Sequence, residues 1–513
     1  MLLAELVAAS DAVAGTRSRL AKVDALAGLL TGLAPDEIVP AVGMLVAKPR
    51  QGRVGVGWRG WAAASEAAGE PPEQPSLTIG EVDDLLDRLL ATSGQGSAGA
   101  RQAILRELTE RATAAERDFL GRVLLGELRT GALEGVLVDA LARASDQPGP
   151  VVRRAAMLSG DLGETARIAL AVEPDEPGAL AAVGLVVGRP VLPMLAATAA
   201  SPAEAIGTTG EASIEYKLDG ARIQVHRAGD DVRVFTRNLA DITHRLPEVV
   251  EVVRGLPVDR VILDGETLAL DEDDAPRPFQ DTMSRFGAET AREALLHPWF
   301  FDVLHVDGRD LIDEPLAARL AELERIAPGH RIPGEVSADP EAAERVSRDA
   351  LAAGHEGVVV KAIDSVYAAG RRGSSWIKVK PVLTYDLVVL AAEWGYGRRT
   401  GWLSNLHLGA RDPDGEFGEP GGFVMVGKTF KGLTDRLLTW QTERFQELET
   451  SRTANTVHIA PVLVVEIAID GVQRSTRYPG GVALRFARVK AYRDDKRPDE
   501  ADTIQALRGL LRG

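Results

Sequence analysis

The sequence predicts a multidomain protein with three parts: an all-α N-terminal domain, an α+β domain with antiparallel sheets, and a β-barrel. Apolar residues recur at helical spacing through the first 205 residues, and short alternating runs typical of strands begin at residue 213. Further strands with one helix follow residue 384, which suits a small five-stranded barrel. A chain of 513 residues is too long for one core, because domains usually hold ~100–200 residues. We expect domains over residues 1–205, 206–382 and 383–513.

The N-terminal helices are marked by a cap and by apolar stripes. Thr78 and Glu81 have the spacing of a capping box, and apolar residues follow at helical spacing. These apolar residues are Val82, Leu85, Leu86, Leu89 and Leu90. Similar periodicity over residues 101–125, 133–144 and 151–170 predicts further helices.

The composition excludes several classes of protein. Without any cysteine, the chain has no disulfides, no thiol nucleophile and no zinc site that needs Cys ligands. The N-terminus has no basic segment ahead of its apolar residues, as a secretory signal would have. Arg189, Pro190 and Pro193 interrupt the most apolar run, residues 177–200, before it could span a bilayer. We expect a cytoplasmic protein without a membrane anchor.

The net charge of −16 argues against a nucleic-acid partner only if the basic residues are evenly spread. They are not, because residues 485–497 carry six basic residues against two acids. The six are Arg485, Arg488, Lys490, Arg493, Lys496 and Arg497. A local excess of this kind can bind phosphate despite the acidic total.

The stretch Glu215-Tyr-Lys-Leu-Asp-Gly-Ala-Arg222 places one lysine between two carboxylates. Residues 213–217 and 221–227 alternate apolar and polar residues like half-buried strands, with Asp219-Gly220 at the bend. Lys217 would then lie at a strand end and face a cleft. A lysine amine becomes a nucleophile after losing its proton, which nearby positive charge or desolvation favours. The alternative is a hairpin turn with a solvated lysine, since Asp-Gly is a common hairpin signal.

Later strand-like runs carry charged and aromatic residues. They are Val232-Arg-Val-Phe-Thr-Arg237, Val261-Ile-Leu-Asp-Gly-Glu266, Trp299-Phe-Phe-Asp-Val-Leu304, Gly357-Val-Val-Val-Lys361 and Trp376-Ile-Lys-Val-Lys380. Lys378 and Lys380 lie two residues apart on one strand, so they should face the same side. The alternative is a pair of surface lysines on an edge strand. Helical patterns interrupt the strands at about 339–353 and 433–449.

Taken in order, these motifs resemble the motif set of the covalent nucleotidyltransferases, which comprise DNA ligases, RNA ligases and capping enzymes. The motifs are Lys217-x-Asp-Gly-x-Arg222, Phe235-Thr-Arg237, Leu263-Asp-Gly-Glu266, Phe300-Phe-Asp302, Glu356-Gly-Val-Val-Val-Lys361, Trp376-Ile-Lys-Val-Lys380, Arg485-Phe-Ala-Arg488 and Arg493-Asp-Asp-Lys496. Three further stretches resemble the linker and OB domain of three-domain ATP-dependent DNA ligases: Pro190-Val-Leu-Pro-Met-Leu-Ala196, Gly401-Trp-Leu-Ser-Asn-Leu-His-Leu-Gly409 and Gln473-Arg-Ser-Thr-Arg-Tyr-Pro-Gly480. The resemblance covers nearly the whole chain; one departure is Ala487, where many relatives have proline.

This resemblance implies an ATP-dependent DNA ligase in which Lys217 is the catalytic residue. Lys217 would take AMP from ATP and release pyrophosphate, AMP would pass to the 5′-phosphate at a nick, and the 3′-hydroxyl would displace AMP. Each step is an in-line phosphoryl displacement helped by Mg²⁺, for which Mn²⁺ is a substitute. The implied partner is nicked double-stranded DNA. A helical DNA-binding domain, a nucleotidyltransferase domain and an OB domain would together encircle the duplex. The protein would act as a monomer at the nucleoid.

The resemblance also implies roles for particular residues. Those expected to bind ATP are Glu215, Arg222, Arg237, Glu266, Phe301, Arg372, Lys378, Lys380, Arg488, Arg493 and Lys496. Among them, Phe301 would stack on adenine, Arg222 would bind ribose, and the two lysines of the Trp376 motif would hold the α-phosphate. Glu266 and Glu356 would hold the metal ion, because Mg²⁺ prefers a few carboxylates plus phosphate and water. Arg129 and Gly131 match a turn that contacts the DNA backbone.

Residues of the last motif are expected to orient the leaving pyrophosphate, after the OB domain swings on a hinge at about 381–386. Alternative enzymes with these motifs are an RNA ligase and a guanylyltransferase of mRNA capping, which the long helical N-terminal region disfavours. An NAD-dependent ligase would need an extra nicotinamide-binding domain and a Cys-ligated zinc element, which the absence of cysteine excludes. A non-catalytic nick-binding protein of the same fold would have lost a catalytic position, and none is missing.

Overall fold

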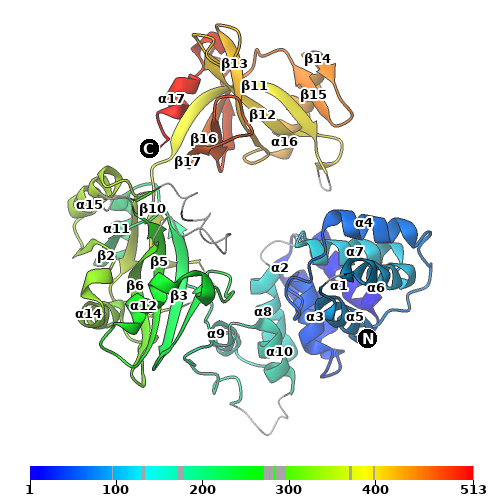
Figure 1. Ribbon diagram of the computed structural model, residues 1–513, viewed down its shortest axis with the longest axis vertical. Helices are drawn as coiled ribbons and strands as arrows, with labels where there is room; N and C mark the ends of the chain where they lie inside the picture. The colour runs from blue at the N-terminus through cyan, green and yellow to red at the C-terminus, as the bar shows by residue number, and fades with distance from the viewer. Residues whose placement is uncertain are drawn as a thin grey trace.

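The computed structural model describes residues 1–94, 96–128, 133–171, 178–270, 276–277, 282, 296–368, 372–396 and 399–511. A helical N-terminal region is followed by a middle and a C-terminal region that are rich in sheets (Figure 1). This order and the antiparallel character of the sheets agree with the sequence prediction. Within the described part of the chain, no helix has the length and apolarity needed to cross a membrane.

The N-terminal helices enclose one apolar core. They are α1 (Leu3–Gly15), α2 (Arg19–Thr31), α3 (Ile38–Leu45), α4 (Trp58–Ala67), α5 (Ile79–Ala91), α6 (Ser97–Arg111), α7 (Ala114–Leu125), α8 (Leu133–Ala144), α9 (Gly149–Ser159) and α10 (Leu162–Ala171). The predicted capping box is confirmed, because Thr78 and Glu81 cap α5 reciprocally. A second box, formed by Thr113 and Glu116, begins α7 and divides the stretch 101–125 into two helices.

The middle region contains two five-stranded sheets. The first has the order β1 (Leu195–Thr198), β10 (Arg372–Val379), β9 (Val358–Ala362), β2 (Ala212–Tyr216) and β8 (Gly334–Ser337), and α11 (Pro202–Thr209) and α15 (Pro340–Ala352) pack on it. The second has the order β4 (Asp231–Thr236), β3 (Ala221–Ala228), β5 (Arg260–Ala269), β6 (Leu296–Val306) and β7 (Arg309–Asp310), with α12 (Pro247–Arg254) and α14 (Leu316–Ile326) in its core. The described strand neighbours are antiparallel except β1 and β10.

The bend at Asp219-Gly220 connects these two sheets. β2 pairs with β8 and β9, whereas β3 pairs with β4 and β5, so β2 and β3 do not form a hairpin. The hairpin alternative for Lys217 is therefore wrong. A Cβ at Gly220 would lie 2.5 Å from the carbonyl oxygen of Thr267 on β5, so only glycine lets the bend pass this close to the second sheet.

The C-terminal region is built around β11 (Leu383–Trp394), which pairs with β12 (Leu403–Asp412), β15 (Thr456–Ile459) and β16 (Val464–Ile469). The other elements are β13 (Gly422–Thr429), α16 (Asp435–Glu447), β14 (Glu449–Arg452), β17 (Gly471–Arg474), β18 (Val482–Arg485), β19 (Arg488–Tyr492) and α17 (Ile504–Arg508). Among the described strands no ladder joins β13 to β19, so a closed barrel stays a prediction.

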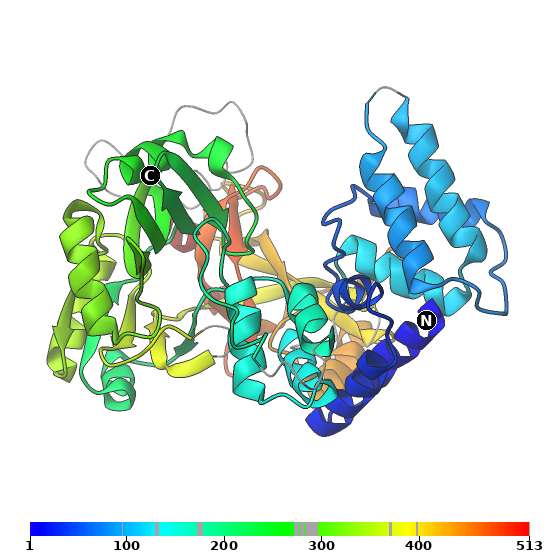
Figure 2. The ribbon, with the colours of Figure 1, turned by 90° about the horizontal axis from the view of Figure 1, so that it is seen from below.

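The three regions meet at the middle one. In Figures 1 and 2 the helices α8 to α10 lie between the other N-terminal helices and the middle region. Met157 and Leu158 of α9 share an apolar cluster with Phe301 and Trp376 of the middle region. Arg154 adds a two-pronged ion pair to Asp313, with distances of 2.7 and 2.6 Å. The N-terminal helices are therefore docked next to the sheets that carry Lys217.

Candidate active site

A cavity of about 340 Å³ lies between the two sheets of the middle region, and Lys217 lines it. Seven of the predicted site residues share its walls: Glu215, Lys217, Arg222, Arg237, Glu266, Phe301 and Lys378. The cavity also contains residues that were not predicted, namely Lys361, Trp376 and the linker residues Met194, Leu195 and Ala196. The structure thus brings together residues from positions 194 to 378 of the chain.

Lys217 is fixed by the backbone of the strand that follows Glu356. Its N–H donates to the carbonyl oxygen of Gly357 at 2.8 Å, and its own carbonyl oxygen accepts from the N–H of Glu356 at 2.9 Å. The Lys217 ammonium is ion-paired with the Glu356 carboxylate, whose other oxygen lies 3.7 Å from Lys380 Nζ. Glu356 is therefore hydrogen-bonded to the amine that the sequence predicts as the nucleophile.

Arg222 is held in a buried network at one wall of the cavity. Its Nε and Nη2 donate to the two oxygens of Asp264 at 3.0 and 2.6 Å, and its Nη1 donates to the carbonyl oxygen of Met194 at 2.7 Å. Tyr367 donates to Asp264 at 2.7 Å and accepts from the N–H of Met194. Burial lowers the pKa of Arg222, but Asp264 outweighs burial and the pKa lies above its ordinary value.

The adjoining wall is aromatic and contains a buried ammonium group, and the Arg222 guanidinium carbon lies 5.3 Å from the centre of the Phe301 ring. Lys361 Nζ lies 4.3 Å from the ring centres of both Phe301 and Trp376, and it is ion-paired with Glu215. Ser213 donates to the other oxygen of Glu215 at 2.9 Å. Cation–π contact and the ion pair together offset the desolvation of this lysine. A charged residue at the end of the apolar run Gly357-Val-Val-Val-Lys361 was a visible sign of this role.

Glu266 and Glu356 are the carboxylates that fit a metal ion. Both interact with Lys217, and burial raises the pKa of Glu266 to about 7, an effect that Lys217 and Arg222 partly oppose. In the described part of the chain no group of three or more His, Cys, Asp or Glu side chains forms a cation site. Two carboxylates beside this cavity still suit Mg²⁺, which needs only a few protein carboxylates and can take its remaining ligands from phosphate and water.

The two lysines of the Trp376 motif reach different places. Lys378 lines the cavity with Lys217. Lys380, one residue beyond the end of β10, pairs with Asp470 of the C-terminal region at 2.7 Å. It lines a neighbouring cavity of about 370 Å³ between the middle and C-terminal regions. In that cavity Arg485 bonds both oxygens of Asp219, at 2.8 and 3.2 Å.

The structure does not bring the predicted residues of the last motif to Lys217. Arg493 and Lys496 both pair with Asp386, and Arg488 is exposed on β19. Three further predictions cannot be compared, because Arg129, Gly131 and the side chain of Arg372 lie outside the described residues.

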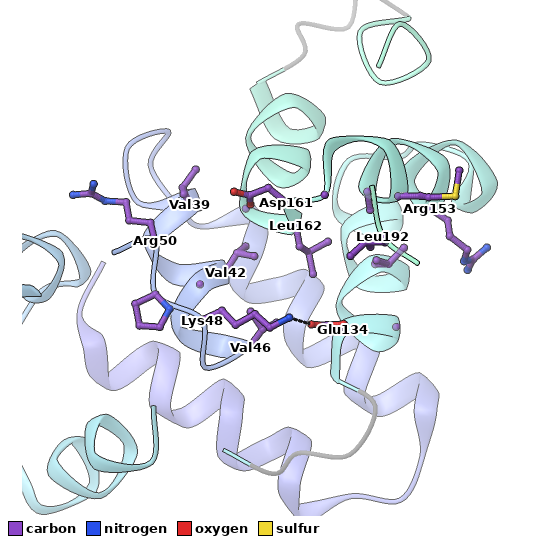
Figure 3. Close-up of a pocket in the computed structure, with 18 of the residues that line it drawn as sticks. Val39, Val42, Val46, Lys48, Arg50, Glu134, Arg153, Asp161, Leu162 and Leu192 are labelled. Atoms are coloured by element: carbon purple, nitrogen blue, oxygen red, sulfur yellow. Dashed lines mark hydrogen bonds and ion pairs between the residues drawn. The ribbon is translucent and has the colours of Figure 1, made fainter. Parts of the chain in front are cut away.

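A larger cavity, of about 750 Å³, lies among the N-terminal helices. Val39 and Val42 of α3 and Val46 just after it line the cavity together with Leu162 and Leu192, and Lys48 pairs with Glu134 at 2.7 Å beside them (Figure 3). It contains none of the predicted ATP-binding residues and is mostly apolar. The chemistry predicted from the sequence therefore belongs to the cavity around Lys217.

Comparisons with known proteins cover all three regions. Residues 193–380 match the family model described as ATP dependent DNA ligase domain, residues 61–142 match DNA ligase N terminus, and residues 399–496 match ATP dependent DNA ligase C terminal region. The chain is similar to the probable DNA ligase of Pseudarthrobacter chlorophenolicus, at 72% identity over 512 residues and all of both chains. It is 58% identical over 518 residues to the probable DNA ligase of Rhodococcus jostii, again over all of both chains. A solved structure titled Pmar-Lig_PreS3 has the same fold, with a TM-score of 0.61, 19% identity, and coverage of 95% of this chain and 99% of that one.

Proposed function

The chain belongs to the ATP-dependent DNA ligase family, and from that premise we propose that it seals nicks in duplex DNA through a lysyl-AMP intermediate on Lys217. The observation that carries the proposal is the cavity between the two sheets. It combines the Lys217 amine with carboxylates, cations and aromatic rings that suit a nucleotide. Each group of wall residues is expected to contact a different part of ATP.

In the first step Lys217 Nζ attacks the α-phosphorus of ATP. The N–P bond forms, the bond from that phosphorus to the bridging oxygen breaks, and pyrophosphate leaves. Glu356 accepts the hydrogen bond from the Lys217 ammonium, so it is in place to take the proton. Lys378 supplies positive charge to the phosphate oxygens from the same cavity. Glu266 and, when it is not accepting the proton, Glu356 would hold Mg²⁺, which would stabilise the charge on the transferring phosphoryl group.

The remaining walls bind adenosine. Phe301 is an aromatic platform for adenine, and the Glu215 carboxylate, which is ion-paired with Lys361, accepts from the 6-amino group. Arg222 and Arg237 line the same cavity, and we expect Arg222 to bind the ribose. Once AMP is attached to Lys217, the 5′-phosphate of a nick displaces the lysine. The 3′-hydroxyl then displaces AMP and closes the strand.

Duplex DNA is expected to contact an exposed aromatic and cationic face of the C-terminal region. Tyr396, Phe430 and Phe486 are 79%, 45% and 60% exposed. Arg399 lies over the Phe430 ring at 5.9 Å, and Lys431 lies over the Phe486 ring at 5.4 Å. Cations with aromatic rings suit phosphate and sugar–base surfaces without reading sequence. The positive charge of this face lets it contact DNA although the net charge of the chain is −16.

The domain division also remains a proposal: residues 1–205 bind DNA, residues 206–382 adenylylate, and residues 383–513 form an OB barrel. Closure of the barrel is supported where β13 and β19 approach, because the N–H of Val489 donates to the carbonyl oxygen of Lys431 at 2.9 Å. β1 is a strand of the first sheet and α11 packs on that sheet, although β1 and the first turn of α11 precede residue 206. One chain carries all three parts, so we expect a monomer, acting at the nucleoid in the cytoplasm because its substrate is DNA.

The test is incubation with α-labelled ATP and Mg²⁺, followed by denaturing electrophoresis. We expect a covalent label that Lys217→Ala removes and that Lys22→Ala, a change on helix α2, leaves intact. Chasing the labelled protein with nicked duplex should move the label to DNA and then release AMP with a sealed strand. The proposal is wrong if no label forms, or if the label survives in the Lys217→Ala protein.

A further inference from the structure

Asp386 is the fourth residue of β11, the first strand of the C-terminal region. Its carboxylate is buried and is ion-paired with two cations of the last motif. Arg493 Nη1 lies 3.3 and 3.2 Å from the two oxygens, and Lys496 Nζ donates to one of them. The sequence places Asp386 at the end of the expected hinge, about 381–386, but predicts no role for its side chain.

The backbone around Asp386 holds its carboxylate in place. The N–H of Asp386 donates to Asp502 Oδ2 at 2.7 Å, and the N–H of Asp502 donates to the carbonyl oxygen of Asp386 at 2.8 Å. β11 also pairs with β16 along residues 383–388. Since Asp386, Arg493 and Lys496 belong to the same region, a swing of that region as a rigid body does not separate them.

Asp386 occupies the Lys496 ammonium and Nη1 of Arg493, while Nε and Nη2 of Arg493 donate to Asp495 at 2.9 and 2.7 Å, so both cations are engaged by carboxylates of the same region and not by a triphosphate. Neither lines the cavity with Lys217. The C-terminal region is instead joined to the middle region by Arg485 on Asp219 and by Lys380 on Asp470. The hydrogen bond to Asp386 raises the pKa of Lys496, so the ammonium stays charged and attracted to this carboxylate.

We propose that Asp386 is a positioning residue that competes, within the chain, with the β- and γ-phosphates of ATP for Arg493 and Lys496. This inference rests on the proposed function, because it assigns these cations to the leaving pyrophosphate. While Asp386 holds the two cations, they are unavailable to ATP. The apparent Kd for ATP is therefore the intrinsic Kd divided by the fraction of molecules in which the cations are free. A triphosphate carries more negative charge than one carboxylate and displaces it. After pyrophosphate leaves, Asp386 takes the cations back.

The experiment compares Asp386→Asn with the full-length wild type in two assays. The first is the KM for ATP in lysyl-AMP formation. The second is sealing of nicked DNA that already carries AMP on its 5′-phosphate. We expect Asp386→Asn to lower the KM for ATP about five-fold, since partly exposed ion pairs are weak, and to leave the second assay unchanged.

Matched variants separate this role from a general effect of charge or folding. Asp499→Asn removes the same charge close in sequence to the last motif, where Asp499 pairs with exposed Arg497, and should keep the wild-type KM. Asp386→Glu keeps the carboxylate and should stay close to wild type. In a chain that already carries Lys496→Ala, the effect of Asp386→Asn should shrink, because the two residues act through one contact. If Asp386→Asn lowers the melting temperature, Asp386→Ser replaces it in the two assays.

An unchanged or raised KM in Asp386→Asn, or an equal fall in Asp499→Asn, overturns the inference. Such results with normal wild-type labelling would leave the proposed function intact. Failure of the wild-type protein to form lysyl-AMP would instead remove the proposed function itself. The two failures are therefore distinguishable in the same experiment.

Discussion

Arg319 and Asp302 form a fully buried ion pair beneath the second sheet of the middle region. Arg319 bonds both carboxylate oxygens, at 2.7 and 3.1 Å, and also the carbonyl oxygen of Ser365. Removing one partner of such a pair leaves an uncompensated buried charge. Asp302 belongs to β6, next to the predicted adenine platform Phe301.

We predict that Arg319→Met lowers the free energy of unfolding by about 3–5 kcal/mol, because Asp302 remains buried without its cation. The measurement is urea unfolding followed by fluorescence. Arg325→Met is the matched control, since Arg325 lies on the same helix but is exposed and pairs only at the surface with Glu322. Its unfolding curve should stay close to wild type. Similar losses in both variants would contradict the prediction.

Glu393 of the C-terminal region accepts from three side chains. Burial would raise the pKa of Glu393, but hydrogen bonds from Lys428, His407 and Asn405 outweigh it and lower the pKa to about 2. A folded-state pKa below the unfolded value means that the unfolded chain binds more protons in this range. The stabilisation is therefore present above about pH 4.5 and is lost as the pH falls toward about 2.

We predict that Glu393→Gln destabilises the protein by about 2 kcal/mol near neutral pH and by progressively less below about pH 4.5. Urea unfolding of both proteins at a series of pH values measures the difference. A difference that stays constant down to about pH 3 would show that the carboxylate charge is not the cause.

At the level of single residues, the structure groups neighbouring residues of the Lys217 motif in one cavity, and their roles stay predictions. Glu215, Lys217 and Arg222 lie within eight residues of one another, and a short motif is enough to place them in one cavity. Contacts between residues far apart in the sequence could not be predicted from it. Nothing in the sequence links Asp386 to Arg493, 107 positions away, because a pattern of charges does not state which charges meet.

At the level of elements, Gly357 precedes β9, the central strand of the first sheet, and lies between β10 and the Lys217 backbone. Its φ is +138°, and a Cβ there would lie 2.3 Å from the carbonyl oxygen of Val379 on β10. Its carbonyl oxygen accepts from Lys217, and Glu356 precedes it. A side chain at this position would strain the backbone and push β9 away from β10.

We predict that Gly357→Ala lowers the rate of lysyl-AMP formation about 100-fold, because it displaces Glu356 and Lys217 by a fraction of an ångström or more. A quench assay with labelled ATP measures the rate. Gly207→Ala is the control, since a Cβ there meets no atom within 4 Å on helix α11. A rate in Gly357→Ala within a few-fold of wild type would contradict this role for Gly357.

Elements were predicted more reliably than their partners. The helices near 339–353 and 433–449 are α15 and α16, and the capping box at Thr78 begins α5. Periodicity identifies such elements because it records which face is buried. It does not record which strands pair, so the separation of β2 and β3 into different sheets was not foreseen. That pairing depends on contacts made by the whole middle region.

At the level of the whole molecule, the apolar residues fall into separate cores. One lies within the N-terminal helices, one in the second sheet of the middle region, and one in the C-terminal region. Separate cores unfold with limited cooperativity. The middle region is connected to its neighbours chiefly by the α9 cluster and by a few ion pairs, Arg154 with Asp313 among them.

We predict that calorimetry shows more than one thermal transition, and that ATP with Mg²⁺ raises mainly one of them. The Lys217→Ala protein is suitable, because no covalent AMP can form. Ligand at 100 times its Kd stabilises the region that binds it by about 2.7 kcal/mol. One transition that shifts as a whole would mean that the three regions unfold together.

Met194 at the end of the linker and Leu195 and Ala196 at the start of β1 line the cavity around Lys217, and the backbone of Met194 is bonded to Arg222 and Tyr367. An inhibitor that fills the adenosine site and extends toward Leu195 would therefore press on the segment that connects the N-terminal helices to the catalytic sheets. Such a compound could interfere with nucleotide binding and with the placement of the helices at once. It would also have a basis for selectivity over nucleotidyltransferases that lack those helices.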